Sequence, residues 1–247
     1  MTVLKSLIDL IYPPRCFICQ TFLQDQGALQ EGQSLPFCQT CFKDFTTITS
    51  PICSLCGRPF SEGIEQDRVC EDCIRKRPSY DLARAPYLYD GAPMRAIHEL
   101  KYARRSHLAD SLGRLLASFA QNWIGELKGV VIMPVPLHPR RLRARGFNQS
   151  LLLARCVASK TGSDLDFLSL RRTKFTKPQT ELSSEERKKN VRKAFEVVNA
   201  EPVKKRTILL VDDVATTGST LNECSKALKQ AGADSVLCLV LARTSTA

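Results

Sequence analysis

The chain has 247 residues and a formal net charge of +11; 43% of its residues are hydrophobic and 25% are charged. These values are ordinary for a globular protein of one large domain or two smaller ones. No apolar run reaches the roughly 18 residues that a membrane-spanning helix requires, and the N-terminus lacks the basic start and the cleavage site of a secretory signal peptide. We therefore expect a cytoplasmic protein without a membrane span.

Charge and cysteine are both unevenly distributed along the chain. Residues 1–80 hold 8 Lys and Arg against 9 Asp and Glu, whereas residues 81–247 carry a net charge of +12. Eight of the 11 cysteines lie between positions 16 and 73. These shifts predict a cysteine-rich segment over 1–80 and a basic domain over 84–247, for which we expect an anionic partner or substrate.

The eight N-terminal cysteines form four Cys-x-x-Cys pairs. This spacing lets both sulfurs of a tight turn point at one ion, so that two turns supply a tetrahedral shell of four thiolates. A disulfide framework would need an oxidising compartment, and no feature of the sequence exports the chain. Pairing in sequence order is favoured over a cross-braced arrangement, because each pair's nearest partner already closes a compact loop. We predict two structural Zn²⁺ sites, one at Cys16, Cys19, Cys38 and Cys41 and one at Cys53, Cys56, Cys70 and Cys73.

From about residue 84 the pattern changes to apolar strands that alternate with amphipathic helices. Gly162 and Gly232 each follow a helical stretch, as glycine does at many helix C-termini. Strands that alternate with helices predict a parallel α/β sheet with helices on both faces. We expect strands over 85–90, 130–137, 194–197, 207–211 and 235–243, and helices over 94–105, 107–127, 148–162 and 220–232.

The stretch LLVDDVATTGST, residues 209–220, combines two acidic residues with a run of small hydroxyl residues. Its amides after Ala215 would converge at a helix N-terminus, which favours a phosphate, and Gly218 would let the backbone approach closely. No Walker A motif occurs, which excludes a P-loop NTPase. A phosphorylated sugar fits both features, because the loop can bind its phosphate while Asp212 and Asp213 accept hydrogen bonds from the ring hydroxyls, with Mg²⁺ assisting.

Several motifs together resemble a known family. The stretch ILLVDDVATTGST (208–220) is similar to the fingerprint of type I phosphoribosyltransferases. With the cysteine-rich start, VPLHPRRLRARGFNQS (135–150) and KPQTELSSEERKKNVRKAF (177–195) extend the resemblance to ComF/GntX-like proteins over essentially the whole chain. The resemblance implies a parallel sheet of the type I phosphoribosyltransferase kind with a small N-terminal zinc-ribbon domain.

The resemblance also implies a substrate, 5-phosphoribosyl-1-pyrophosphate (PRPP) with Mg²⁺, and the loops that bind it. These are the fingerprint over 212–220, a pyrophosphate loop near 134–140, and a basic lid within 172–190, a segment that also reads as a charged helix. Asp212 and Asp213 would be the catalytic residues. The other candidates are Ala215, Thr216, Thr217, Gly218, Ser219 and Thr220 for PRPP, and Leu137, His138, Arg140, Arg141 and Arg145 for the pyrophosphate.

One position departs from the purine-salvage members of this group. They carry a carboxylate just before the Thr-Gly of the loop, whereas this chain has Thr216 there, so the loop lacks a base for the acceptor. The acceptor is therefore not expected to be a purine base, unless the domain binds PRPP without turnover. Two functions remain: phosphoribosyl transfer to an unknown acceptor, and non-catalytic binding of single-stranded DNA by the basic face, because ComF relatives are associated with DNA uptake in natural transformation.

Overall fold

The structure, a computed structural model, describes residues 12–23, 29–30, 33–60, 63–102, 108–124, 129–175 and 191–245; only the backbone is described for 29–30, 33–34 and 102. Most of the segment expected to form a lid lies outside these residues, because 176–190 are not described. Within the described residues, no helix is long and apolar enough to cross a membrane.

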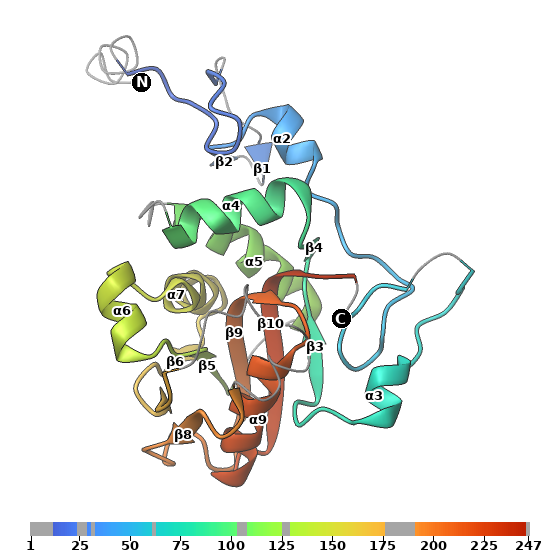
Figure 1. Cartoon of the computed structure of the whole chain (residues 1–247), viewed down its shortest axis with the longest axis vertical. Helices are drawn as coiled ribbons and strands as arrows, with labels where there is room; N and C mark the ends of the chain where they lie inside the picture. Colours follow the sequence, from blue (N-terminus) through green and yellow to red (C-terminus); the bar gives the residue numbers. More distant parts are fainter. Residues whose placement is uncertain are drawn as a thin grey trace.

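Six strands form one parallel sheet at the centre of the molecule (Figure 1). The spatial order is β3, β10, β9, β5, β6, and the short strand β4 pairs with the end of β10. The parallel α/β sheet predicted from the sequence is therefore confirmed. The strands are β3 (Leu82–Arg84), β4 (Tyr87–Leu88), β5 (Val130–Pro134), β6 (Asp164–Leu165), β9 (Thr207–Ala215) and β10 (Ser235–Arg243).

Helices cover both faces of this sheet. Because successive side chains of a strand point to opposite faces, Leu209 and Val211 pack with α4, α5 and α7, whereas Ile208 and Leu210 pack with α9. Burial on both faces explains why β9 and β10 are nearly continuous aliphatic runs. The helices are α4 (Gly91–Tyr102), α5 (Leu108–Ile124), α7 (Gln149–Thr161) and α9 (Ser219–Gln230).

The chain leaves the middle of the sheet in two directions. From β5 it passes through α6 (Pro139–Arg145) and α7 to β6 at one edge, and from β9 it passes through α9 to β10 on the other side. The neighbouring strands β5 and β9 therefore form the topological switch point, where open α/β sheets bind ligands beyond the carboxyl ends of their strands.

The two halves of the cysteine-rich segment pack on opposite faces of the sheet. Cysteines of the first half share the apolar core of α4 and α5, and those of the second half share the core of α9. The second half also lies against β3: the Ala83 amide donates to the Leu55 carbonyl at 2.8 Å, and a Cβ at Gly57 would meet the Ala83 oxygen at 2.4 Å. The short elements of this segment are β1 (Leu29–Gln30), β2 (Gln33–Ser34), α2 (Gln39–Lys43) and α3 (Glu71–Arg75).

Some elements differ from the expectation. The strand predicted to end at residue 211 continues to Ala215, because its last residues still pair with β10; the acidic pair therefore lies inside β9. Helix α6 occupies part of the expected pyrophosphate loop: His138 caps it, and Gly146 ends it with a φ of 88°. The segment expected at 194–197 is β8 (Phe195–Val197), which pairs with β7 (Leu170–Arg172) in a separate antiparallel ribbon.

Candidate functional site

A cavity of about 470 Å³ opens beyond the carboxyl ends of β5 and β9, at the switch point of the sheet. Its walls come from α4, the segment after β5, α6, the start of α7, β7 and the end of β9. It brings together seven residues that the sequence singled out: Leu137, Arg141, Arg145, Asp212, Asp213, Thr216 and Thr220.

The two aspartates are buried, and each has a partner from a different helix. Asp212 is 8% exposed, and its Oδ1 accepts a hydrogen bond of 2.7 Å from the Ser150 hydroxyl at the start of α7. Asp213 is 4% exposed, and its Oδ2 lies 2.8 Å from Lys101 Nζ on α4. The Asp213 amide also donates to Asp212 Oδ1 at 2.9 Å. The orientation of both carboxylates is thus fixed by neighbours far away in sequence.

Burial sets the protonation behaviour of this pair. Loss of solvation, followed by the charge of Asp213, raises the pKa of Asp212 to about 7. Burial alone would lower the pKa of Lys101, but the attraction of Asp213 outweighs it, so the pKa of Lys101 is raised. At neutral pH Lys101 is therefore charged, and Asp212 is poised between its two forms, so it can accept from or donate to a ligand hydroxyl.

The hydroxyl-rich loop joins β9 to α9. Gly218 adopts a φ of 70° at the N-cap of α9, a left-handed conformation that favours glycine. The Thr217 and Ser219 hydroxyls lie 2.7 Å apart, and Thr216 and Thr220 line the cavity. Backbone amides at the N-terminus of a helix, next to such hydroxyls, suit a phosphate group.

Three arginines form a cationic wall in the same cavity: Arg141 and Arg145 on α6, and Arg172 on β7. Arg145 donates a hydrogen bond to the Gln149 side chain, which fixes it against α7. Arg172 was expected in a flexible lid, but it lies in a strand and is 7% exposed. Burial, with Arg141 as the second cause, lowers its pKa, although an arginine stays charged.

Two of the predicted anion-binding residues lie outside the cavity lining. His138 Nδ1 accepts a hydrogen bond of 3.2 Å from the Arg140 amide, and its ring centroid lies 5.2 Å from that of Phe175. The Arg140 guanidinium lies 5.3 Å from the same ring. His138 thus serves as a helix cap in this structure. Conversely, the cavity is completed by Tyr89, Met94 and Lys101, which belong to no motif, and by Gln149 and Ser150, which end the motif over 135–150 but were not predicted as site residues.

The eight N-terminal cysteines form two clusters in which the sulfur atoms lie within 4.8 Å of one another. The grouping follows sequence order, first with second pair and third with fourth, so the cross-braced alternative is not found. Amides of Cys56 and Cys70 donate to Cys53 Sγ at 3.4 and 3.3 Å. A hydrogen bond from the Cys56 thiol is the main cause that lowers the pKa of Cys53 to about 4. Both clusters fit the tetrahedral thiolate shell of a zinc ribbon.

Known proteins share both parts of this chain. Residues 7–74 match the model of the double zinc ribbon domain, and residues 148–246 match that of the phosphoribosyl transferase domain. The DNA utilization protein YhgH of Escherichia coli (strain K12) is 35% identical over 212 residues, which cover 84% of this chain and 90% of that protein.

Two further relatives carry competence names. Competence protein F of Haemophilus influenzae is 32% identical over 83% of this chain and 90% of its own length. Competence protein ComFC of Bacillus subtilis (strain 168) is 30% identical over 79% of this chain and 78% of its own length.

The chain belongs to the ComF/YhgH family.

Neither domain match includes residues 75–147 of this ComF/YhgH family chain. That stretch supplies α4, β5 and α6, and hence Lys101, Arg141 and Arg145 of the cavity. The phosphoribosyl transferase match supplies Ser150, the acidic pair and the hydroxyl loop.

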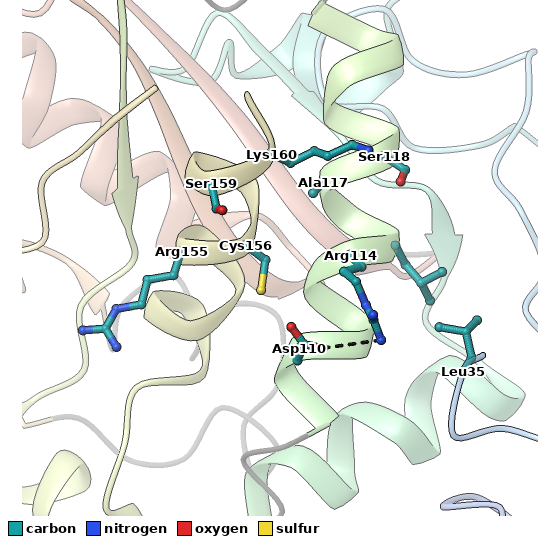
Figure 2. Close-up of a pocket in the computed structure, with 10 residues that line it drawn as sticks. Leu35, Asp110, Arg114, Ala117, Ser118, Arg155, Cys156, Ser159 and Lys160 are labelled. Carbon is teal, nitrogen blue, oxygen red and sulfur yellow. Dashed lines mark ion pairs between the residues drawn. The ribbon is translucent and has the colours of Figure 1, made fainter. Parts of the chain in front are cut away.

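A second cavity, of about 550 Å³, lies between α5 and α7 (Figure 2). Arg114 forms an ion pair of 3.4 Å with Asp110 on one side, and Cys156 points toward α5 from the other. Lys160 extends from α7 across the cavity (Figure 2). Among the described residues that line it, none is a predicted site residue and none lines the switch-point cavity.

Proposed function

We propose that the switch-point cavity binds PRPP together with Mg²⁺, and that the protein transfers the phosphoribosyl group to an acceptor that is not a purine base. The observation that carries this proposal is the meeting of three groups in one cavity: the buried acidic pair, the hydroxyl loop at the start of α9, and the cationic wall of Arg141, Arg145 and Arg172. These groups are complementary to ring hydroxyls, a monophosphate and a pyrophosphate.

Each part of the ligand then has a place. The loop over 216–220 takes the 5′-phosphate at the helix N-terminus. Asp212 and Asp213 bind the ribose hydroxyls, and the arginine wall faces the pyrophosphate. Mg²⁺ binds phosphate oxygens and, when bound, neutralises charge on the pyrophosphate. The protein's own contribution is positioning and stabilisation of the leaving group.

The chemistry of the loop limits the acceptor. Thr216 stands where purine-salvage members carry a carboxylate, and a threonine hydroxyl is not a base at neutral pH. The acceptor would have to bring its own nucleophile or be deprotonated by another group of the cavity.

The two cysteine clusters would each hold one Zn²⁺ in a closed, structural site. Because each cluster packs into one of the two cores of the sheet, bound zinc would stabilise both faces of the domain that carries the cavity.

Titration calorimetry with PRPP and Mg²⁺ tests the main proposal. Wild-type protein should release heat, and the double variant Asp212→Ala, Asp213→Ala should not. Asp110→Ala, which removes an exposed carboxylate of the other cavity, is the matched control and should bind like wild type. No heat with wild-type protein at millimolar PRPP would refute the proposal.

We infer single-stranded DNA binding as a second function, supported by the names of the relatives and by a surface of contiguous cavities. Leu137 and Arg172 line both the switch-point cavity and a neighbour of about 510 Å³, and Arg155 lines both that neighbour and the cavity of Figure 2. Phe167 is 45% exposed, with the Arg155 guanidinium 6.0 Å from its ring centroid. Exposed aromatic rings stack on bases, and arginines bind the backbone phosphates of single strands.

Fluorescence anisotropy with a labelled oligonucleotide tests the second function. Affinity should fall steeply with salt, and Arg155→Gln combined with Phe167→Ala should weaken binding more than Lys226→Gln, which removes an exposed charge from α9. Binding that is indifferent to salt, or that both variants weaken equally, would contradict this function.

A further inference from the structure

Lys101 reaches the acidic pair from outside every motif that the sequence reveals. Its Nζ lies 2.8 Å from Asp213 Oδ2, and the side chains of Lys101 and Asp213 are 18% and 5% exposed. Both residues line the switch-point cavity. The contact therefore lies within the site itself, so its loss should change the affinity for a ligand.

We propose that Lys101 is the resident cation of the acidic pair, so that the ribose hydroxyls of the ligand bind to Asp212 and Asp213 without a metal ion, and Mg²⁺ serves only the pyrophosphate. This inference rests on the proposed function, because it assigns the parts of a phosphoribosyl ligand to separate charges. It names Lys101 as a positioning and specificity-determining residue.

The charge balance of the cavity supports this assignment. Two adjacent buried carboxylates repel each other, and a buried charge is costly unless it is paired. Asp212 has a neutral hydroxyl as a partner, Ser150, whereas Lys101 supplies a positive charge in direct contact with Asp213. A divalent ion bound at Asp213 Oδ2 would have to displace this ammonium group.

The packing of α4 explains why Lys101 is in position before any ligand arrives. Ile97 and Leu100, on the preceding turn, are fully buried. At the other end of α4, Asp44 Oδ2 accepts a hydrogen bond of 2.9 Å from the Ala92 amide and lies 3.2 Å from Arg95 Nη2.

Asp44 itself belongs to the first zinc ribbon. It directly follows α2, the helix that carries Cys41, and Figure 1 shows α2 next to the N-terminal end of α4. A side chain at Gly91 would collide with Asp44 Oδ2, 2.8 Å from its Cβ. Contacts of Asp44 in the first zinc ribbon thereby fix the position of α4, the helix that places Lys101 in the site.

Ribose 5-phosphate is the probe that separates the role of Lys101 from that of Mg²⁺. It has the hydroxyls and the monophosphate of PRPP but no pyrophosphate. We expect the affinity of wild-type protein for ribose 5-phosphate to change less than about twofold between EDTA and Mg²⁺. Lys101→Met should bind it about tenfold more weakly in EDTA, because a buried carboxylate has lost its partner, and should regain affinity with Mg²⁺. Lys101→Arg should stay within about threefold of wild type.

The matched control is Lys226→Met, which removes one positive charge from an exposed position on α9 and should leave both affinities unchanged. A requirement for Mg²⁺ in wild-type binding of ribose 5-phosphate would overturn the inference and leave the proposed function standing. Metal-free binding by Lys101→Met equal to wild type would overturn it as well. Failure of wild-type protein to bind PRPP with Mg²⁺ would instead refute the proposed function. The wild-type comparison needs no variant, so the inference stays testable if Lys101→Met does not fold.

Discussion

Ser150 and Asp212 lie 62 residues apart in sequence, yet the Ser150 hydroxyl donates a hydrogen bond of 2.7 Å to Asp212 Oδ1. This bond stabilises the charged form of the carboxylate, so it opposes the effect of burial and lowers the pKa of Asp212. The start of α7 thus tunes the charge of the acidic pair on β9.

Ser150→Ala should raise the pKa of Asp212 above its wild-type value of about 7, because the hydrogen bond to the carboxylate is lost. If PRPP binding requires ionised Asp212, its pH dependence should move to higher pH. Calorimetric titrations between pH 6 and 9 measure this shift, with Ser159→Ala, an exposed serine near the other end of α7, as the control. An unchanged pH profile would show that the hydroxyl does not tune the site.

Asp212→Asn should make the protein more stable at neutral and higher pH. The folded-state pKa of Asp212 is raised from 3.8 to about 7. The contribution of protonated Asp212 to the free energy of unfolding is therefore fully present below about pH 3.8 and is lost as pH rises through about 7. Ionised Asp212 then costs on the order of a few kcal/mol. Denaturant unfolding should show the excess stability of the variant growing from about pH 4 to about pH 7 and levelling off at higher pH. A constant difference would contradict the assigned pKa.

Gly218→Ala should weaken ligand binding more than it weakens the fold. Its φ of 70° costs an alanine about 1 kcal/mol, and the new Cβ would lie 3.3 Å from the Tyr80 hydroxyl, so Tyr80 or the hydroxyl loop must move slightly. Gly129→Ala is the matched control, since its φ is 77° and a Cβ there meets nothing within 4 Å. We expect similar losses in the free energy of unfolding but a drop in PRPP affinity for Gly218→Ala alone.

Gly57→Ala should detach the second half of the cysteine-rich segment, which carries the cluster of Cys53, Cys56, Cys70 and Cys73, from the edge of the sheet. The added Cβ would lie 2.4 Å from the Ala83 carbonyl oxygen, a backbone atom of β3 that cannot rotate away. We expect a loss of more than about 2 kcal/mol in the free energy of unfolding, against about 1 kcal/mol for Gly63→Ala, whose φ is 90° without such a contact. Equal losses would mean that strain alone accounts for the effect.

Zinc should leave the two clusters at different rates. All four cysteines of the second cluster are buried, whereas Cys19 of the first is exposed. A chelator reaches an exposed ligand first, so zinc release followed with a chromogenic chelator should have two phases. Cys19→Ser should speed up or abolish only the fast phase, and Cys53→Ser only the slow one. A single phase for wild-type protein would contradict this order.

Local spacing was enough to predict much of this protein. The Cys-x-x-Cys pairs and the helix that ends at Gly162 depend on contacts between near neighbours, which a sequence pattern records. The acidic pair followed by a hydroxyl loop was visible for the same reason. The strand over 235–243 was visible as an unbroken apolar run. Even so, the strand that carries the pair continued beyond the predicted end, because pairing with β10 extends it.

Only the tertiary structure decided what surrounds the pair. Ser150 and Lys101 come from two helices and meet Asp212 and Asp213 because a parallel sheet places the ends of distant elements at one edge. The ribbons pack on opposite faces because side chains alternate along β9 and create two separate cores. Such contacts depend on the spatial order of the strands, and neither composition nor periodicity encodes that order directly.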